Sequence, residues 1–228
     1  FNDYIRSSNK IIEKRSEIKK QSDNYENIKS KSKKIQDISG SCGSNLHFEQ
    51  NSSSFSLIIT GTGTMTSYSN TENGLSPWND VRDSILFIEI ENGVTSIGSY
   101  AFYNCINLIS IKIPDTVTTI GSYALYNAYE LKEFEFPPNI KTISPSCLRQ
   151  CKNIKSIEIP YGVTTIQSNA FDTCNGCISV SIPQTVTSIG DYAFYAMYKL
   201  ESIEIPTSIT ELPNQVFRSC YALTQVTI

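Results

Sequence analysis

The sequence predicts a solenoid of stacked repeats, because one short segment of alternating apolar and polar residues returns at a fixed step. Ile111-Lys112-Ile113-Pro114 is its clearest copy. Copies begin at residues 88, 111, 134, 157, 180, 203 and 226, so every step is 23 residues. A period in the twenties with one short strand per unit is typical of a leucine-rich-repeat solenoid. The predicted class is α/β or mainly β, with a parallel concave sheet and short helical turns on the convex side.

Positions that stay apolar from copy to copy predict the core. One such column holds Val94, Val117, Ile140, Val163, Val186 and Ile209, and another holds Phe102, Leu125, Leu148, Phe171, Phe194 and Phe217. Stacked repeats bury equivalent positions on one another, so these columns should face inward. Proline after each strand has no N–H and ends the pairing. Apolar residues spaced i, i+4 and i+7 from Ala101 to Leu108 predict the convex helical turn.

The residues before the first repeat predict an N-terminal cap. The Gly- and Ser-rich residues 39–43 indicate a break, after which Leu46 and Phe48 alternate, and then Phe55, Leu57 and Ile59. This pattern across a polar turn predicts a β-hairpin. A solenoid must close its apolar end with an atypical unit. We therefore divide the chain into a Lys/Ser-rich segment (1–38), a cap (39–87) and about six repeats (88–228).

Residues 1–38 are polar and are predicted to be helical or disordered. Tyr4, Ile11, Ile18 and Tyr25 lie seven apart, which is half of a coiled-coil seam, but the complementary positions are polar. A helix that is solvated or leans on a partner is favoured over a coiled coil. The segment could mediate self-association, and so could the last strand at 226–228, because it has no capping repeat after it.

Charge is unevenly distributed along the chain. Residues 1–38 hold ten Lys or Arg and six Asp or Glu (+4), and residues 39–228 hold nine and sixteen (-7). The acidic repeats argue against nucleic-acid binding there. No apolar run approaches the roughly 18 residues of a membrane span. Because Phe1 is not an initiator methionine, we expect a piece of a longer protein, whose signal or anchor the segment does not reveal.

Catalytic and metal-binding constellations are weak. Cys174-x-x-Cys177 resembles half a zinc site, but both residues fill inward columns, where free cysteine behaves as a small apolar residue. His47 is the only histidine, which argues against zinc and against a Ser-His-Asp or Cys-His arrangement. We predict no enzyme activity and no cofactor. All seven cysteines should be free thiols, and at most Cys42 should react in the native protein.

Two surfaces are candidate binding sites. Alternation along each strand should point its middle residue outward, which gives the candidate residues Glu89, Lys112, Glu133, Glu135, Glu158, Ser181 and Glu204. They could simply keep the sheet soluble or could form an acidic-to-hydroxyl surface for a basic or extended partner. A candidate aromatic ridge on the convex side consists of Tyr100, Tyr103, Tyr123, Tyr126, Tyr192, Tyr195 and Tyr198. Tyrosine is favoured at interfaces, but it also covers turns between repeats, which is the simpler interpretation.

The repeat unit at 94–114, VTSIGSYAFYNCINLISIKIP, resembles the BspA-like leucine-rich-repeat family. The lead-in motifs Ser41-Cys42-Gly43, Gly61-Thr62-Gly63 and Ser76-Pro77-Trp78 resemble its N-terminal cap, so the likeness covers about residues 40–228. The family comprises surface antigens and adhesins of anaerobic bacteria and many proteins of parasitic protists. The resemblance carries over no catalytic residues.

The resemblance implies a non-catalytic protein-binding module, displayed on a cell surface or secreted. Its partner would be a host matrix protein or another cell-surface protein. An intracellular scaffold in the cytoplasm is the alternative, since seven free cysteines suit a reducing compartment.

Overall fold

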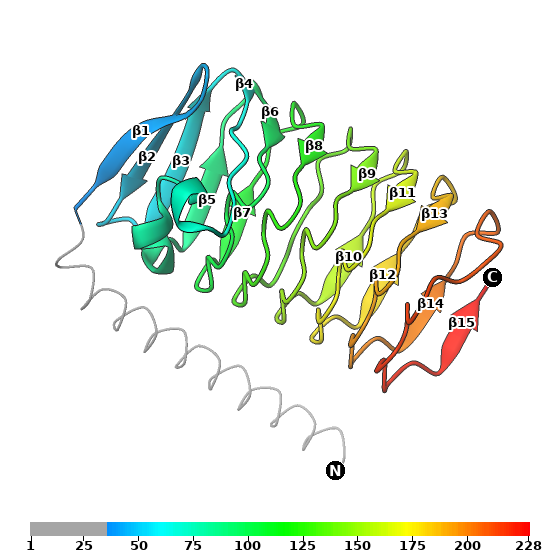
Figure 1. Cartoon of the computed structure of the whole chain (residues 1–228). Coiled ribbons are helices and arrows are strands. Elements are labelled where there is room, and N and C mark those ends of the chain that lie inside the picture. The colour runs from blue at the N-terminus through cyan, green and yellow to red at the C-terminus, as the bar shows by residue number, and fades with distance from the viewer. Residues whose placement is uncertain (1–35) are drawn as a thin grey trace, which may run out of the picture. The chain divides into compact units, whose positions relative to one another are not determined.

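Short parallel strands stack along one axis in the computed structural model, which describes residues 36–228 (Figure 1). The first row consists of β5 (Phe87–Ile90), β7 (Ser110–Lys112), β10 (Ser156–Glu158), β12 (Ser179–Ser181), β14 (Ser202–Glu204) and β15 (Gln225–Thr227). Paired residues are 23 apart, as in Ile88 with Ile111 and Ile203 with Val226. We number the repeats from Ile88, so that the first is 88–110 and the sixth is 203–225. The predicted solenoid is confirmed.

A second row of strands, which the sequence analysis did not predict, runs along another side of the stack. It contains β4 (Gly63–Thr64), β6 (Val94–Ile97), β8 (Thr119–Ile120), β9 (Thr142–Ile143), β11 (Thr165–Ile166) and β13 (Ser188–Ile189). Most of these strands have only two residues, too few for an alternation to be visible. Their apolar members, such as Val94 and Ile97, point inward as the columns predicted.

The third side of each repeat is built from tight turns rather than from the predicted helical turn. The amides of Ala101 and Tyr103 donate to carbonyls three residues back, at 3.3 Å. The alternate amides of Tyr100 and Phe102 instead donate to Ser122 and Ala124 of the next repeat, at 2.9 and 2.8 Å. Because every second amide donates its hydrogen bond to the next repeat, the continuous i to i−4 hydrogen bonds of an α-helix cannot form. Apolar spacing thus located the buried residues correctly but suggested the wrong backbone geometry.

The core is a set of columns running along the stack. Val117, Leu125, Leu131 and Phe194 are fully buried, and they contact the equivalent residues of neighbouring repeats within one continuous cluster. Each buried Leu or Phe side chain contributes about 1.5–3 kcal/mol relative to leaving it in water.

Three antiparallel strands form the cap at the N-terminal end of the stack: β1 (Ile38–Gly43), β2 (Leu46–Asn51) and β3 (Ser56–Gly61). The predicted hairpin is the β2–β3 pair, and the Asn51 side chain accepts hydrogen bonds from the amides of Ser53 and Ser54 in its turn. The predicted break at 39–43 is wrong, because these residues form the edge strand β1. β3 then pairs in parallel with β5, so the sheet of the cap continues into the first repeat.

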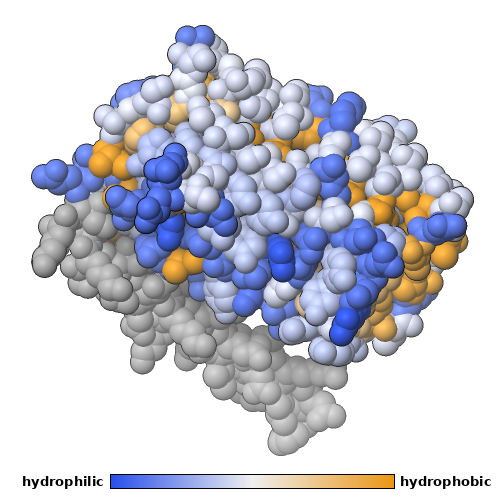
Figure 2. All heavy atoms as spheres, viewed as in Figure 1, coloured by the Kyte–Doolittle hydropathy of each residue, from blue (hydrophilic) through white to orange (hydrophobic). Residues whose placement is uncertain are grey.

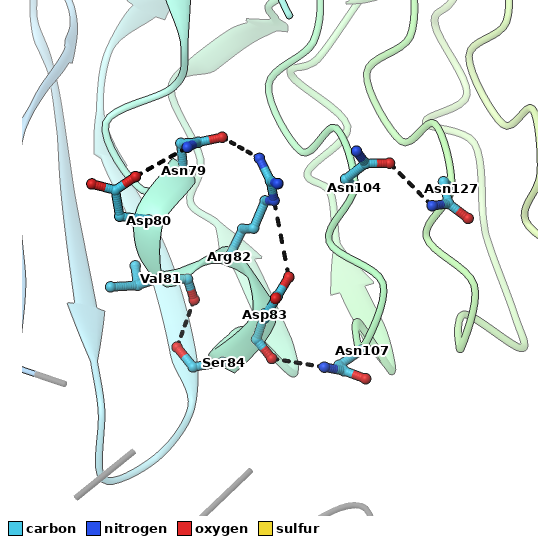
Figure 3. Close-up of polar contacts among 9 residues, drawn as sticks. All are labelled: Asn79, Asp80, Val81, Arg82, Asp83, Ser84, Asn104, Asn107 and Asn127. Atoms are coloured by element: carbon cyan, nitrogen blue, oxygen red, sulfur yellow. Dashed lines mark hydrogen bonds and ion pairs between the residues drawn. The ribbon is translucent and has the colours of Figure 1, made fainter. Parts of the chain in front are cut away.

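Trp78 joins the cap to the first repeat. Its side chain is 1% exposed, stacks on Phe102 at 5.7 Å between ring centroids, and donates its indole N–H to the carbonyl of Ala101 at 2.8 Å. Two short 3₁₀ helices flank it, η1 (Glu72–Gly74) and η2 (Asn79–Ser84). The Asn107 amide donates to the Asp83 carbonyl at 2.8 Å and ties the end of η2 to the first repeat (Figure 3).

The stack is interrupted between the second and third repeats. In the first row the third repeat contributes no strand, because residues 134–136 pair with neither β7 nor β10. In the second row one sheet ends at β8 and another starts at β9 (Figure 1). Hydrogen bonds on the turn side continue across the junction, as from Tyr123 to Pro145 at 3.1 Å. No strand pairing crosses the junction on either sheet side, where only single hydrogen bonds remain, such as that from the Lys155 amide to the Lys132 carbonyl at 3.2 Å.

Two phenylalanines account for this junction. Phe134 and Phe136 occupy inward positions where every other repeat has Ile or Val, and their rings pack edge to face at 4.7 Å. Ile111 and Ile113 on the facing strand are only half-buried, whereas Ile157 and Ile159 in the fourth repeat are 3% exposed. We infer that the larger rings keep residues 134–136 from pairing with the neighbouring strands, because a packed core transmits added volume to its neighbours.

The division of the chain at 38/39 and 87/88 stays a prediction, and residues 1–35, with the helix expected there, lie outside the described residues. Hydrophobic side chains are exposed at the C-terminal end of the stack, among them Val226 and Ile228 (Figure 2). Self-association through that end likewise stays a prediction.

The first prediction concerns the junction between the second and third repeats. Phe134→Ile with Phe136→Ile should let the third repeat pair with β7, and slow amide hydrogen exchange at residues 132–136 by about tenfold, a local gain of about 1.4 kcal/mol. The reverse change, Ile157→Phe with Ile159→Phe, should open the next junction and speed exchange at β12. Unchanged or faster exchange in the first variant would show that the phenylalanines do not cause the gap.

Candidate functional site

The outward side of the first strand row carries the predicted charged residues, and we call it the acidic sheet face. Glu89 is exposed on β5, and Lys112, Glu158, Ser181 and Glu204 are the exposed last residues of β7, β10, β12 and β14 rather than their middle residues. Glu133 and Glu135 are exposed on the segment between β7 and β10. Parallel pairing holds equivalent residues about 4.8 Å apart between adjacent paired strands. The structure thus brings the predicted residues onto one surface, with the junction falling between Lys112 and Glu135.

One ion pair neutralises the N-terminal part of this face. Lys112 Nζ lies 2.7 Å from Glu89 Oε1. This hydrogen bond, and the charge of Glu89, raise the pKa of Lys112. Both side chains are well exposed, so the pair contributes little to stability. The unbalanced negative charge therefore lies on the C-terminal part of the face. There, Glu133, Glu135, Glu158 and Glu204 form no ion pair within residues 36–228.

Phe87 adds an aromatic side chain that we did not predict as a site residue. It lies on β5, is 41% exposed, and pairs with Ser56 on one side and Ser110 on the other. Ile58, opposite Glu89 on β3, is partly exposed on the same face. The signal was present in the sequence, since Phe87 occupies an outward column that elsewhere holds Ser, Glu or Gln.

The predicted aromatic ridge divides into separate groups. Tyr100 stacks on Tyr123 at 4.7 Å between centroids, and Tyr103 stacks on Tyr126 at 4.9 Å. Within each repeat the two rings are tilted by 51° and 49°. We call these four residues the tyrosine cluster. Farther along, Tyr192 meets Tyr195 edge-on at 5.8 Å, and Tyr198 stacks on Tyr221 at 5.3 Å.

A charged pair continues the ridge where tyrosine is absent. The column of Tyr103 and Tyr126 continues with Arg149, whose guanidinium lies 6.0 Å from the Tyr126 ring centroid, and with Asp172. Arg149 Nε lies 2.8 Å from Asp172 Oδ2, and Asp172 is 3% exposed and also accepts a hydrogen bond from Thr173. We missed this pair, although opposite charges 23 residues apart in one column are a readable signal.

The cysteines are core residues. All seven are free, as predicted, and six are buried. Cys151 and Cys174 each donate a weak hydrogen bond to a carbonyl 26 residues earlier, at 3.2 and 3.1 Å. No group of three or more His, Cys, Asp or Glu within residues 36–228 is arranged to hold a metal ion. We expected at most Cys42 to be accessible, but Cys42 is 2% exposed and Cys220, expected to be buried, is the one partly exposed cysteine of the seven.

Within residues 36–228, no helix is both long and apolar enough to cross a bilayer.

Sequence comparison matches residues 81–175 and 149–228 to the model of the BspA-type leucine-rich repeat region, in six copies. This match indicates no catalytic family. No curated protein matches the chain in sequence.

Solved structures to which the chain is similar include three bacterial proteins. A leucine-rich cell surface protein from Faecalibacterium prausnitzii is 24% identical, with a TM-score of 0.60 over 83% of this chain and 54% of its own. The chain thus spans about half of that protein. A leucine-rich repeat protein from Eubacterium ventriosum is 21% identical, with a TM-score of 0.45 over 84% of this chain and 72% of its own. The leucine-rich repeat protein of Treponema pallidum is 19% identical, with a TM-score of 0.46 over 79% and 78%.

The second prediction concerns the buried thiols: the protein should lose stability at alkaline pH. Burial raises the pKa of Cys105 and of Cys147 from 9.0 to about 12, and that of Cys177 to about 11. The pKa of these thiols is higher in the folded state than in the unfolded state. Their full contribution to the free energy of unfolding is therefore present below pH 9 and is lost as the pH rises toward 12. The urea midpoint should therefore fall progressively above pH 9.

Cys105→Ala is the matched variant, because Ala128 already fills that column one repeat later. Its urea midpoint should fall less steeply with pH than that of the parent chain. Equal slopes between pH 9 and 11 would contradict a thiol origin of the alkaline effect.

Proposed function

Because the chain belongs to the BspA-type leucine-rich repeat family, we propose that it acts on a cell surface as an antigen or adhesin. Membership of this family supports the general part of the proposal, that the chain is a protein-binding repeat module. Surface display is supported by the F. prausnitzii structure, which is described as a cell surface protein. The partner would be a host matrix protein or another cell-surface protein.

The observation that carries the proposal is the acidic sheet face. Four exposed carboxylates, Glu133, Glu135, Glu158 and Glu204, follow one another along the strand row, and the hydroxyls of Ser156, Ser179 and Ser202 alternate with them. On the paired strands Glu158 faces Ser181 and Glu204 faces Thr227, so hydroxyl residues separate these carboxylates. A partner with a basic surface would complement this negatively charged row and gain on-rate from electrostatic steering. Such a face provides an extended contact rather than a pocket, as expected of a solenoid.

Phe87 would anchor the N-terminal end of the same contact. Aromatic side chains at the centre of an interface, surrounded by polar residues that exclude water, tend to supply most of the binding energy. Ser56 and Ser110 flank Phe87, and the neutralised Glu89–Lys112 pair lies on the same face. A partner with an apolar side chain beside a basic segment would match both parts of the face.

An intracellular scaffold is the second candidate, and the free thiols favour it. All seven cysteines are unpaired, and such thiols persist most easily in a reducing compartment. The scaffold would use the same sheet face and would differ in its compartment. Labelling of intact cells with an antibody against the repeats separates the two: surface staining supports the adhesin, and staining only after permeabilisation supports the scaffold.

The third prediction concerns the binding face. Glu135→Lys with Glu158→Lys should weaken capture of the chain by immobilised basic matrix protein by about tenfold or more at low salt. The difference from the parent chain should shrink as salt rises from about 0.1 M to about 1 M, because the Debye length falls from about 10 to about 3 Å.

The control pair is Glu72→Lys with Glu211→Lys. It makes the same change in net charge at exposed positions away from the acidic sheet face, on η1 and beside the second strand row. It should bind nearly as the parent does. Equal weakening by both pairs would mean that net charge alone governs capture, and no effect of either pair would refute the proposed face.

A further inference from the structure

The tyrosine cluster is a second surface whose features the acidic sheet face does not explain. It lies on the turn side of the first and second repeats and carries no formal charge of its own. Tyr100, Tyr103, Tyr123 and Tyr126 are each partly exposed. Their rings form two stacked pairs, side by side, with the 4.7 and 4.9 Å spacing of adjacent repeats.

Two of these tyrosines occupy a backbone conformation that aromatic residues avoid. Tyr100 and Tyr123 have φ of +55° and +57°, in the left-handed region, where Gly, Asn and Asp are favoured. The equivalent residues Ser146, Asn169, Tyr192 and Gln215 also have φ between +53° and +58°, so every repeat has this conformation. What distinguishes Tyr100 and Tyr123 within the column is that each stacks on the other.

The backbone of this surface has no hydrogen-bond donor to offer a ligand. The amides of Tyr100, Phe102 and Asn104 donate to the next repeat at 2.8–2.9 Å, and those of Ala101, Tyr103 and Cys105 donate within the turns at 3.3 Å. An extended peptide therefore cannot bind here by adding a strand, because strand addition requires free main-chain groups. What remains for recognition are ring edges and four phenolic hydroxyls, none of which bonds to another residue within 36–228.

Stacking decides between ligand classes. A sugar ring packs on an open aromatic face, and here the inner faces of each pair cover one another while Arg149 lies over the Tyr126 ring, which leaves a sugar only separate outer faces. A polyproline II segment has different needs. Its backbone makes no internal hydrogen bonds, its prolines lack N–H groups and display carbonyl acceptors, and its rings pack between aromatic side chains. Phenolic O–H donors beside ring edges complement these features.

We propose that the tyrosine cluster binds a proline-rich segment of a partner protein in the polyproline II conformation. The phenolic hydroxyls donate to the carbonyls of the segment, and the proline rings pack against the tyrosine edges. Rigid tyrosines and a preformed polyproline helix both lose little conformational entropy on binding. This site is separate from the acidic sheet face and should be insensitive to salt.

The test uses the whole 228-residue chain and a fluorescent peptide of about ten prolines, with a Gly/Ser peptide of equal length as the reference. Fluorescence anisotropy should show binding of the proline peptide only. Tyr103→Ala with Tyr126→Ala should weaken it by about tenfold or more. Tyr103→Phe with Tyr126→Phe keeps the stack, removes two hydroxyl donors, and should weaken binding by about threefold or more.

Tyr192→Ala with Tyr195→Ala is the matched control, because these residues occupy the same two columns in the fifth repeat without a tyrosine partner in the adjacent repeats. This control and the Glu135→Lys/Glu158→Lys pair should both leave binding of the proline peptide unchanged, which separates this proposal from the first. Equal binding of the two peptides, no binding at all, an unaffected Phe variant, or equal loss in the control would each overturn the proposal. Tyrosine-dependent binding of an oligosaccharide in place of the proline peptide would overturn it as well.

Discussion

Stacking of each residue on its counterpart 23 positions away is the constraint on which the rest of the structure depends. Leu125 and Leu148 are fully buried because each repeat covers the next, and the strand pairs keep the same offset. No single repeat could bury its apolar edge alone. The cap follows from the same need, since Trp78 continues the column of Phe102 and closes it against β2 through Phe48.

The same offset creates the surfaces. A residue type that recurs every 23 positions becomes a row, so a few glutamates make an acidic sheet face and four tyrosines make two stacked pairs. The Phe134–Phe136 junction interrupts the sheet rows but leaves the turn side continuous. It separates the neutralised Glu89–Lys112 pair from the unpaired carboxylates, while the tyrosine cluster lies entirely on its N-terminal side. The two proposed binding surfaces therefore differ in chemistry and lie on different sides of the same stack.

The sequence predicted whatever depends on periodicity. The inward columns, the outward glutamates and the hairpin of the cap were readable because side-chain direction alternates along a strand. Two-residue strands such as β8 were not readable, since alternation needs a longer run. The helical turn expected from Ala101 to Leu108 failed because alternate amides bond to the next repeat, a long-range choice that local spacing does not encode. Arg149, Asp172 and the exposed Phe87 could be recognised in the sequence only because they differ from the other residues of their columns.

The most direct test of this account is deletion of one repeat in register. Removal of residues 180–202 joins Ser179 to Ile203 and should leave the sixth repeat stacked on the fourth. The amides of Phe171 and Thr173, which donate to the fifth repeat in the parent chain, should then still be protected from hydrogen exchange. Removal of residues 180–190, about half a repeat, should abolish that protection, because the later columns no longer meet their counterparts. Equal protection in the two variants would contradict the claim that the 23-residue register holds the protein together.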